Sequence, residues 1–338
     1  MRVALFSLVA AAAASPIAND GALLESRSVD NNFMNNFKFY AQHAAAAYCN
    51  AEGRSPGNAI SCAGGECNDV MRNSATIINT FQGANTGIAG YVSVDRTRRE
   101  IVFAARGSNN LRNFITNLVF TQRDCDFAPG CKVHDGFASA WDEISGAATA
   151  AIRSGLQANP GYRLVITGHS LGGAIGTLAG AYLRRSGYQA SIYTFGAPRI
   201  GNEVFANFAS RQRGGLYRMT HIDDPVPRLP PMIFGYRHGG TEYWLSNGEA
   251  EQINYQGTDV KVCPGIDSVG CNAGTVGFDL PAHLHYLTKT AGCAPPATKW
   301  KRDPEPSDEE LEERFTKWSK QDQELVNNCY YCYTVEVV

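Results

Sequence analysis

The chain has 338 residues, of which 44% are hydrophobic and 18% are charged, and its formal net charge is −2. These values are typical of a globular protein that can bury a substantial core in one or two domains. The charge balance and the absence of a basic stripe argue against a nucleic-acid-binding protein.

Residues 1–14 have the pattern of a secretory signal peptide, with Arg2 before an apolar run that ends in small residues. A short propeptide over residues 15–27 would follow. No later apolar stretch reaches the roughly 18 residues that a membrane helix needs. We therefore expect a secreted, extracellular protein.

Ten cysteines fit such an exported chain, because disulfides persist in oxidising compartments. Spacing favours three local pairs and leaves one pair at the ends of the central region: Cys62/Cys67, Cys125/Cys131, Cys263/Cys271 and Cys49/Cys293. Other pairings stay open, since eight cysteines allow 105 connectivities. No histidine pair accompanies them at zinc-finger spacing, so we expect no metal.

The centre of the chain alternates strand-like and helix-like runs, which predicts an α/β fold with a mostly parallel sheet. Strands are expected at 87–95, 99–108, 162–167, 191–198 and 216–222, and helices at 133–160 and 171–186.

The stretch VITGHSLGGAIG, residues 165–176, places Ser170 between a predicted strand and a predicted helix. A serine at such a turn is typical of a nucleophile elbow, whose sharpness requires glycine two residues to either side. Gly168 and Gly172 meet this requirement. The alternative is a small residue in a structural turn.

A nucleophilic serine needs a histidine to take its proton and a carboxylate to orient the histidine. In this arrangement the chain order is Ser, Asp, His. Asp223 and Asp224 follow a predicted strand, and the histidines after them are His238, His283 and His285. Position alone does not choose between adjacent candidates.

Several stretches, in this order, resemble the filamentous-fungal class 3 lipases, which have the α/β-hydrolase fold with helices on both faces of the sheet. The likeness covers about residues 35–293 and is carried by FKFYAQHAAAAYCN, IVFAARGSNNLRNFITNL, VHDGFASAW, TGHSLGGA, YTFGAPRIGN, THIDDPVPRLPP, FGYRHGGTEYWL and LPAHLHYL.

This resemblance implies Ser170 as nucleophile, Asp224 as acid and His283 as base. It implies an oxyanion hole formed by Ser108 and the backbone N–H of Leu171. It also implies the pairs Cys49–Cys293, Cys62–Cys67 and Cys125–Cys131, and leaves Cys263 for Cys271.

Residues 111–118 carry an apolar stripe at helical spacing: Leu111, Phe114, Ile115 and Leu118. A stripe of this kind is usually static core. In the resembled family this segment is a short helical lid that covers the active site. We expect Arg112, between the apolar positions, to face water when the lid is closed.

The resemblance assigns residues 28–300 to the catalytic domain and leaves 301–338 outside it. Lys301 and Arg302 form a dibasic pair, which predicts that this C-terminal extension is a propeptide removed on maturation. Ser307 and Glu310 suggest a capping box, followed by a helical stripe of Leu311, Phe315, Trp318 and Leu325. The alternative is an uncleaved, solvated helix.

The predicted function is a secreted triacylglycerol lipase that needs no cofactor, acts at an oil–water interface and has no obligate protein partner. The alternatives are a phospholipase A1 or a mono/diacylglycerol lipase. A feruloyl esterase is less favoured, because its lid would be more polar than Leu111, Phe114 and Ile115. A binding protein without catalysis would have lost at least one of Ser170, Asp224 and His283.

Overall fold

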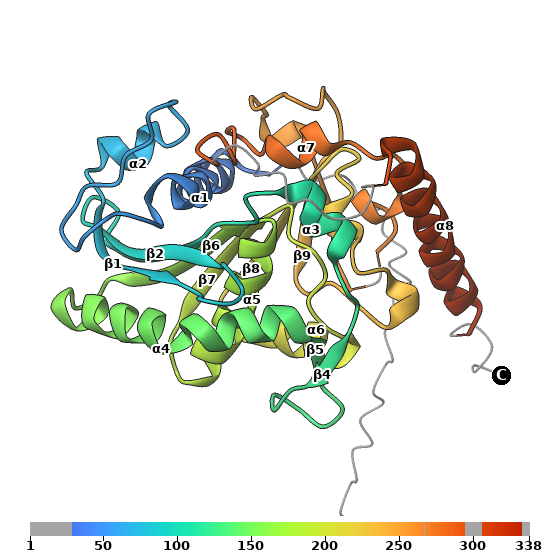
Figure 1. Ribbon diagram of the computed structural model, residues 1–338, viewed down its shortest axis with the longest axis horizontal. Helices are drawn as coiled ribbons and strands as arrows, with labels where there is room; N and C mark the ends of the chain where they lie inside the picture. The colour runs from blue at the N-terminus through green and yellow to red at the C-terminus, as the bar shows by residue number, and fades with distance from the viewer. Residues whose placement is uncertain (1–28, 267, 295–305, 333–338) are drawn as a thin grey trace, which may run out of the picture.

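An eight-stranded sheet forms the centre of the protein (Figure 1). The computed structural model describes residues 29–266, 268–294 and 306–332. Strands β3, β6, β7, β8 and β9 are parallel neighbours, and antiparallel strands extend both edges. In sheet order the strands are β1 Thr76–Gln82, β2 Ala89–Asp95, β3 Glu100–Ala105, β6 Arg163–His169, β7 Ala190–Phe195, β8 Leu216–His221, β9 Thr241–Leu245 and β10 Val260–Cys263. The mostly parallel sheet confirms the predicted fold class.

Helices cover both faces of this sheet. Figure 1 shows α1 on one side and α4 with α5 on the other, and a separate hydrophobic core fills each side. A two-stranded ladder, β4 Gln122–Asp124 with β5 Lys132–His134, lies apart from the main sheet. The helices are α1 Asn31–Asn50, α2 Asn68–Arg72, α3 Leu111–Asn117, α4 Asp135–Ala158, α5 Leu171–Arg185, α6 Glu203–Arg211, α7 Leu280–Leu284 and α8 Asp308–Cys332. Short 3₁₀ turns are η1 Val226–Arg228, η2 Met232–Phe234, η3 Gly257–Asp259 and η4 Asn272–Gly274.

The predicted elements agree with the structure to within a few residues. The helix expected at 133–160 is α4, and the strand expected at 162–167 is β6. Strands β1, β4, β5, β9 and β10 were not predicted. Strands β9 and β10 are short and lie among glycine and polar residues that resemble a loop.

Four disulfides form as expected: Cys49–Cys293, Cys62–Cys67, Cys125–Cys131 and Cys263–Cys271. The first joins residues 244 positions apart and ties the end of α1 to the segment after α7. The other three close short loops.

In the part of the chain that the structure describes, no helix is long and apolar enough to cross a bilayer. The signal peptide expected at 1–14, the propeptide at 15–27 and the dibasic pair Lys301–Arg302 lie outside the described residues.

Candidate active site

Ser170 occupies a sharp turn between β6 and α5. Its φ is 57° and its ψ is −130°, a conformation that residues other than glycine rarely adopt. The turn is held by hydrogen bonds at both ends: Ser170 N–H donates to Phe195 C=O at 2.9 Å, and Gly173 N–H donates to Ser170 C=O at 2.9 Å. The backbone therefore fixes where the hydroxyl lies.

Gly168 and Gly172 make this turn possible. A Cβ on Gly168 would collide with the backbone of Gly172, and a Cβ on Gly172 would collide with the carbonyl of Ala105. The structure thus confirms the steric reason for the two glycines that flank Ser170.

Asp224 and His283 form a buried pair. Nδ1 of His283 lies 2.9 and 3.0 Å from the two carboxylate oxygens of Asp224. Asp224 follows β8, and Val226 N–H donates to its Oδ1 at 2.9 Å. His283 lies on α7, which begins where Asp279 accepts a hydrogen bond from Ala282 N–H at 3.0 Å. Because the imidazole can donate only through an N–H, this contact places the other nitrogen, Nε2, as the possible proton acceptor.

Ser170 Oγ and His283 Nε2 are both buried and have no hydrogen-bond partner among the described residues. Gly196 follows Phe195, whose carbonyl accepts the hydrogen bond from Ser170 N–H. It lies against the Asp224–His283 pair, because a Cβ on Gly196 would be 2.9 Å from Asp224 Oδ2 and 3.0 Å from the His283 ring. The end of β7 therefore borders both the serine and the histidine–aspartate pair. Ser170 Oγ and His283 Nε2 are therefore not hydrogen-bonded to each other in this structure, although they border the same strand end. A hydroxyl and a carboxylate-bound imidazole carry out nucleophilic catalysis when they come within hydrogen-bond reach.

The competing candidates have surroundings that differ from those of Asp224 and His283. Asp223 is partly exposed and borders Gly277. Among the described residues, Nδ1 of His285 has no hydrogen bond to a carboxylate. It lies 2.8 Å from the carbonyl oxygen of Pro281. His238 is buried with Nε2 2.7 Å from Pro227 C=O, and burial lowers its pKa well below the ordinary value.

Three buried side chains around the site were not anticipated. Tyr286 donates its hydroxyl hydrogen to Asp224 Oδ2. His169 stacks on His283 with ring centroids 4.6 Å apart, and its Nε2 lies 2.7 Å from His283 C=O. Since Nε2 must donate to that carbonyl, Nδ1 accepts from Tyr48 O–H at 2.8 Å. Burial, followed by the charge of His283, lowers the pKa of His169 well below its ordinary value, so it stays neutral.

The proposed oxyanion donors lie beside Ser170. Leu171 is the first residue of α5, so its N–H has no acceptor within the helix. Ser108 follows Gly107, whose α-carbon is packed so closely on Ser170 that a Cβ would lie 2.8 Å from the serine Cβ. The hydroxyl of Ser108 donates to Asn110 C=O at 3.0 Å.

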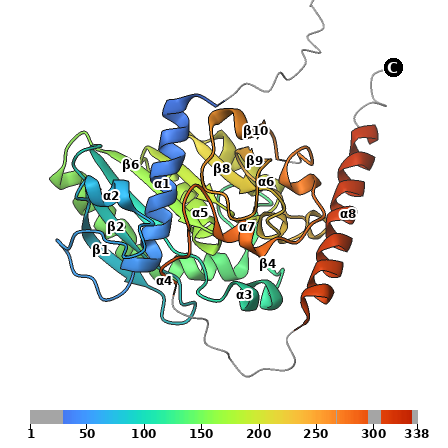
Figure 2. The ribbon, with the colours of Figure 1, turned by 90° about the horizontal axis from the view of Figure 1, so that it is seen from above.

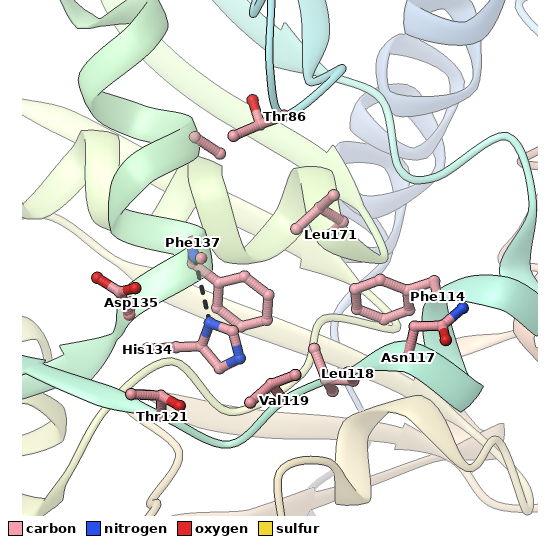
Figure 3. A pocket seen from close by; sticks show the side chains of 12 residues that line it. Thr86, Phe114, Asn117, Leu118, Val119, Thr121, His134, Asp135, Phe137 and Leu171 are labelled. Atoms are coloured by element: carbon pink, nitrogen blue, oxygen red, sulfur yellow. Dashed lines mark hydrogen bonds between the residues drawn. The ribbon is translucent and has the colours of Figure 1, made fainter.

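A pocket of about 440 Å³ opens next to Leu171. Figure 3 shows Leu171 and Phe114 on one side and Phe137 and His134 on the other. Its wall is mainly apolar. His134 accepts from Phe137 N–H at 3.2 Å through Nδ1, and burial lowers its pKa to about 4, so the ring is neutral at physiological pH.

The segment expected to be a lid is helix α3. Ile115 is buried, and Leu111, Phe114 and Leu118 are partly buried against hydrophobic clusters. Arg112, expected to face water, is partly exposed but also contacts the C-terminal helix α8. It donates to the Asp308 carboxylate and to Pro306 C=O, because the C-terminal helix α8 docks beside α3.

Comparisons with known proteins identify the family of the chain. Residues 102–234 match the family described as Lipase (class 3). The secreted mono- and diacylglycerol lipase 1 of Fusarium solani is 48% identical over 329 residues, which cover 96% of this chain and 98% of that protein. The secreted mono- and diacylglycerol lipase A of Penicillium cyclopium is 34% identical over 308 residues, 89% of this chain and all of that protein.

Solved structures give the same result. The mono- and diacylglycerol lipase from Aspergillus oryzae superposes with a TM-score of 0.73 at 35% identity, over 77% of this chain and 98% of that one. Likeness at this identity and coverage extends beyond the fold to the enzyme class, a carboxylic ester hydrolase of the serine hydrolase type. The chain belongs to the class 3 lipase family.

Proposed function

We propose that this protein is a secreted lipase that hydrolyses mono- and diacylglycerols, with Ser170 as nucleophile, His283 as base and Asp224 as the carboxylate that orients it. The observation that carries the chemistry is the His283–Asp224 pair at 2.9 Å, with His283 Nε2 and Ser170 Oγ unpaired and buried. The substrate class and secretion are supported by the relatives in Fusarium and Penicillium, whose names give both.

In the first half-reaction, His283 Nε2 takes the hydroxyl proton of Ser170 while Oγ attacks the ester carbonyl carbon. The carbonyl oxygen becomes an oxyanion, which the N–H of Leu171 and the donor groups of Ser108 stabilise. When the tetrahedral intermediate collapses, the glycerol oxygen leaves and takes the proton from Nε2. The acyl group is then bound to Ser170 as an ester.

In the second half-reaction, His283 Nε2 takes a proton from water, and the hydroxide oxygen attacks the acyl carbon. Collapse of this intermediate returns the proton to Ser170 Oγ and releases the fatty acid. Asp224 stabilises the imidazolium in both halves through the contact with Nδ1.

The pocket beside Leu171 suits the acyl chain. It begins next to the proposed oxyanion donor, and Phe114, Leu118 and Phe137 line it. An apolar wall of this kind binds a hydrocarbon chain through the area that it removes from water. Phe114 and Leu118 belong to the lid segment, so the same residues close the pocket.

Triacylglycerol, the substrate that the sequence analysis favours, remains the second candidate, since the apolar residues of α3 suit any acylglycerol aggregate. For either substrate we propose that the lid opens at a lipid surface. The two candidate functions differ in whether the open site accommodates the third acyl chain of a triacylglycerol.

The test is a substrate panel of monoolein, diolein, triolein, phosphatidylcholine and methyl ferulate, with the Ser170→Ala variant as the control for chemistry. The proposal requires fastest fatty-acid release from monoolein or diolein and loss of activity in Ser170→Ala. Faster release from triolein would establish the second candidate. Release only from phosphatidylcholine or methyl ferulate would overturn both.

A further inference from the structure

Helix α8 lies at the edge of the molecule, on the side that carries α3 and α7 (Figure 2). It begins with the capping box expected from the sequence: Ser307 N–H donates to Glu310 Oε2 at 2.7 Å, and Glu310 N–H donates to Ser307 Oγ at 3.2 Å. The helix is far from solvated on its inner face, because Leu311 and Phe315 are 1% and 2% exposed.

The apolar face of α8 belongs to a hydrophobic cluster that includes residues of the lid segment. Phe315 belongs to one hydrophobic cluster with Ile115 of α3 and with Val226 and Leu229, which follow Asp224. Trp318 packs against the same cluster. The centroid of its ring lies 5.4 Å from that of Phe120, just after α3. The C-terminal helix thus shares a buried apolar cluster with the segment that must move if the pocket is to open.

Polar contacts fix α8 along its length. At its start, Asp308 accepts from Arg112 of α3. Farther along, Asp322 Oδ2 accepts from Arg199 Nη1 at 2.9 Å, with side chains that are 3% and 1% exposed, and Asp322 Oδ1 accepts from Ile233 N–H at 3.1 Å. A buried ion pair with these additional hydrogen bonds fixes one position of the helix, and removal of one partner leaves an uncompensated charge.

The surface beneath α8 continues into exposed apolar side chains. Ile233 and Phe234 are 38% and 48% exposed. Phe120 joins the two parts, because its ring contacts Phe234 at 5.1 Å and Trp318 at 5.4 Å. Exposed apolar side chains that continue under a peripheral helix are characteristic of a larger interaction surface that the helix partly covers.

We propose that this surface, formed by Ile115, Phe120, Leu229, Ile233 and Phe234, is where the enzyme meets its aggregated lipid substrate, and that α8 occupies it as an intramolecular cover that holds α3 closed. The inference rests on the proposed function, which supplies the lipid. Lipid and the stripe of α8 are apolar and compete for the same side chains. Release of α8 by an interface or by cleavage therefore frees α3 to move.

The direct test weakens α8 without changing the site. The experiment uses the full chain, and intact-mass analysis verifies that residues 306–328 are still present. Asp322→Asn removes the charge that pairs with Arg199. Glu324→Gln is the matched control, since it removes one carboxylate from the exposed side of the same helix. Hydrogen–deuterium exchange over α8 reports its detachment, and exchange over β6 reports that the core remains folded.

The proposal expects faster exchange in α8 of Asp322→Asn and about tenfold faster fatty-acid release from emulsified diolein, with a shorter lag. Glu324→Gln should match the wild type. If α8 exchanges faster and diolein hydrolysis stays the same or slows, α8 is a structural element and the proposal is overturned.

A second pair of variants tests the attachment of α8 without leaving a buried charge unpaired, which could disturb folding. Trp318→Ala removes an apolar contact, and Lys317→Ala changes an exposed neighbour. Trp318→Ala should accelerate diolein release and Lys317→Ala should not. If neither Trp318→Ala nor Asp322→Asn changes exchange in α8, these contacts do not hold the helix and the proposal is overturned. Failure of the proposed function gives a different result, in which wild type and all variants cleave a soluble ester but release nothing from diolein.

Discussion

The hydroxyl of Tyr286 donates a hydrogen bond to Asp224 Oδ2, the same oxygen that lies 2.9 Å from Nδ1 of His283. Both side chains are completely buried. Together with Val226 N–H on Oδ1, Tyr286 fixes the rotation of the carboxylate and compensates its buried charge. We therefore expect Tyr286 to act as a positioning residue, through Asp224, in the proposed reaction.

We predict that Tyr286→Phe lowers kcat about tenfold with little change in KM, since a hydrogen bond to a charged group contributes about 1.5–3 kcal/mol. Kinetics on a soluble short-chain ester measure both constants. Tyr91→Phe is the matched control, because Tyr91 is also completely buried, its hydroxyl donates to His43 C=O at 3.1 Å and it does not contact Asp224. An unchanged kcat in Tyr286→Phe would show that Val226 and His283 suffice to hold the carboxylate.

The adjacent aspartates should differ sharply. Asp224→Asn removes the charge that stabilises the imidazolium of His283, so we expect kcat to fall by about 10⁴. Asp223→Asn should change kcat less than about threefold, because Asp223 is partly exposed and is not paired with His283. Both variants are measured on the same soluble ester. Inactivation by Asp223→Asn with retained activity in Asp224→Asn would reverse the assignment of the acid.

Stability should fall on acidification because of buried neutral histidines. Burial lowers the pKa of His134 from 6.5 to about 4. Between these values the unfolded chain binds a proton that the folded chain does not, so the free energy of unfolding decreases as pH falls. This residue contributes a slope of up to about 1.4 kcal/mol per pH unit. Denaturant unfolding at a series of pH values should give a shallower slope for His134→Asn, and parallel curves would contradict the assignment.

The lid hypothesis makes its own prediction for Phe114. Phe114→Ser removes apolar area that binds lipid when α3 opens, and burial of one such side chain contributes about 1.5–3 kcal/mol. Release from emulsified diolein should fall at least about tenfold, with a smaller change on a soluble ester. Thr116→Ser on the same helix is the control. Equal losses on both substrates would mean that Phe114 is static core.

The sequence pattern predicts the strand, turn and helix around Ser170 well, because two glycines, a β-branched strand and a glycine-rich helix start all favour one local geometry. It could not choose between Asp223 and Asp224. That choice depends on the buried contact with His283, 59 residues away, which spacing does not encode.

The docking of α8 shows the same limit. The stripe of Leu311, Phe315 and Trp318 predicts an amphipathic helix, and its capping box predicts where the helix begins. A stripe does not identify the surface that it covers. The roles of Tyr286 and His169 were missed for a related reason, since a tyrosine or histidine within an apolar run gives no signal of the buried polar group that it contacts.

The most direct test of the account is covalent labelling by an alkyl p-nitrophenyl phosphonate, which reacts with an activated serine as an ester does in the first half-reaction. Intact-mass analysis and peptide mapping should find one adduct per chain, on Ser170, with none on Ser170→Ala and labelling of His283→Ala slowed by at least about 10³. Labelling at another residue, or equal labelling rates with and without His283, would contradict the assignment of Ser170 and His283 as nucleophile and base.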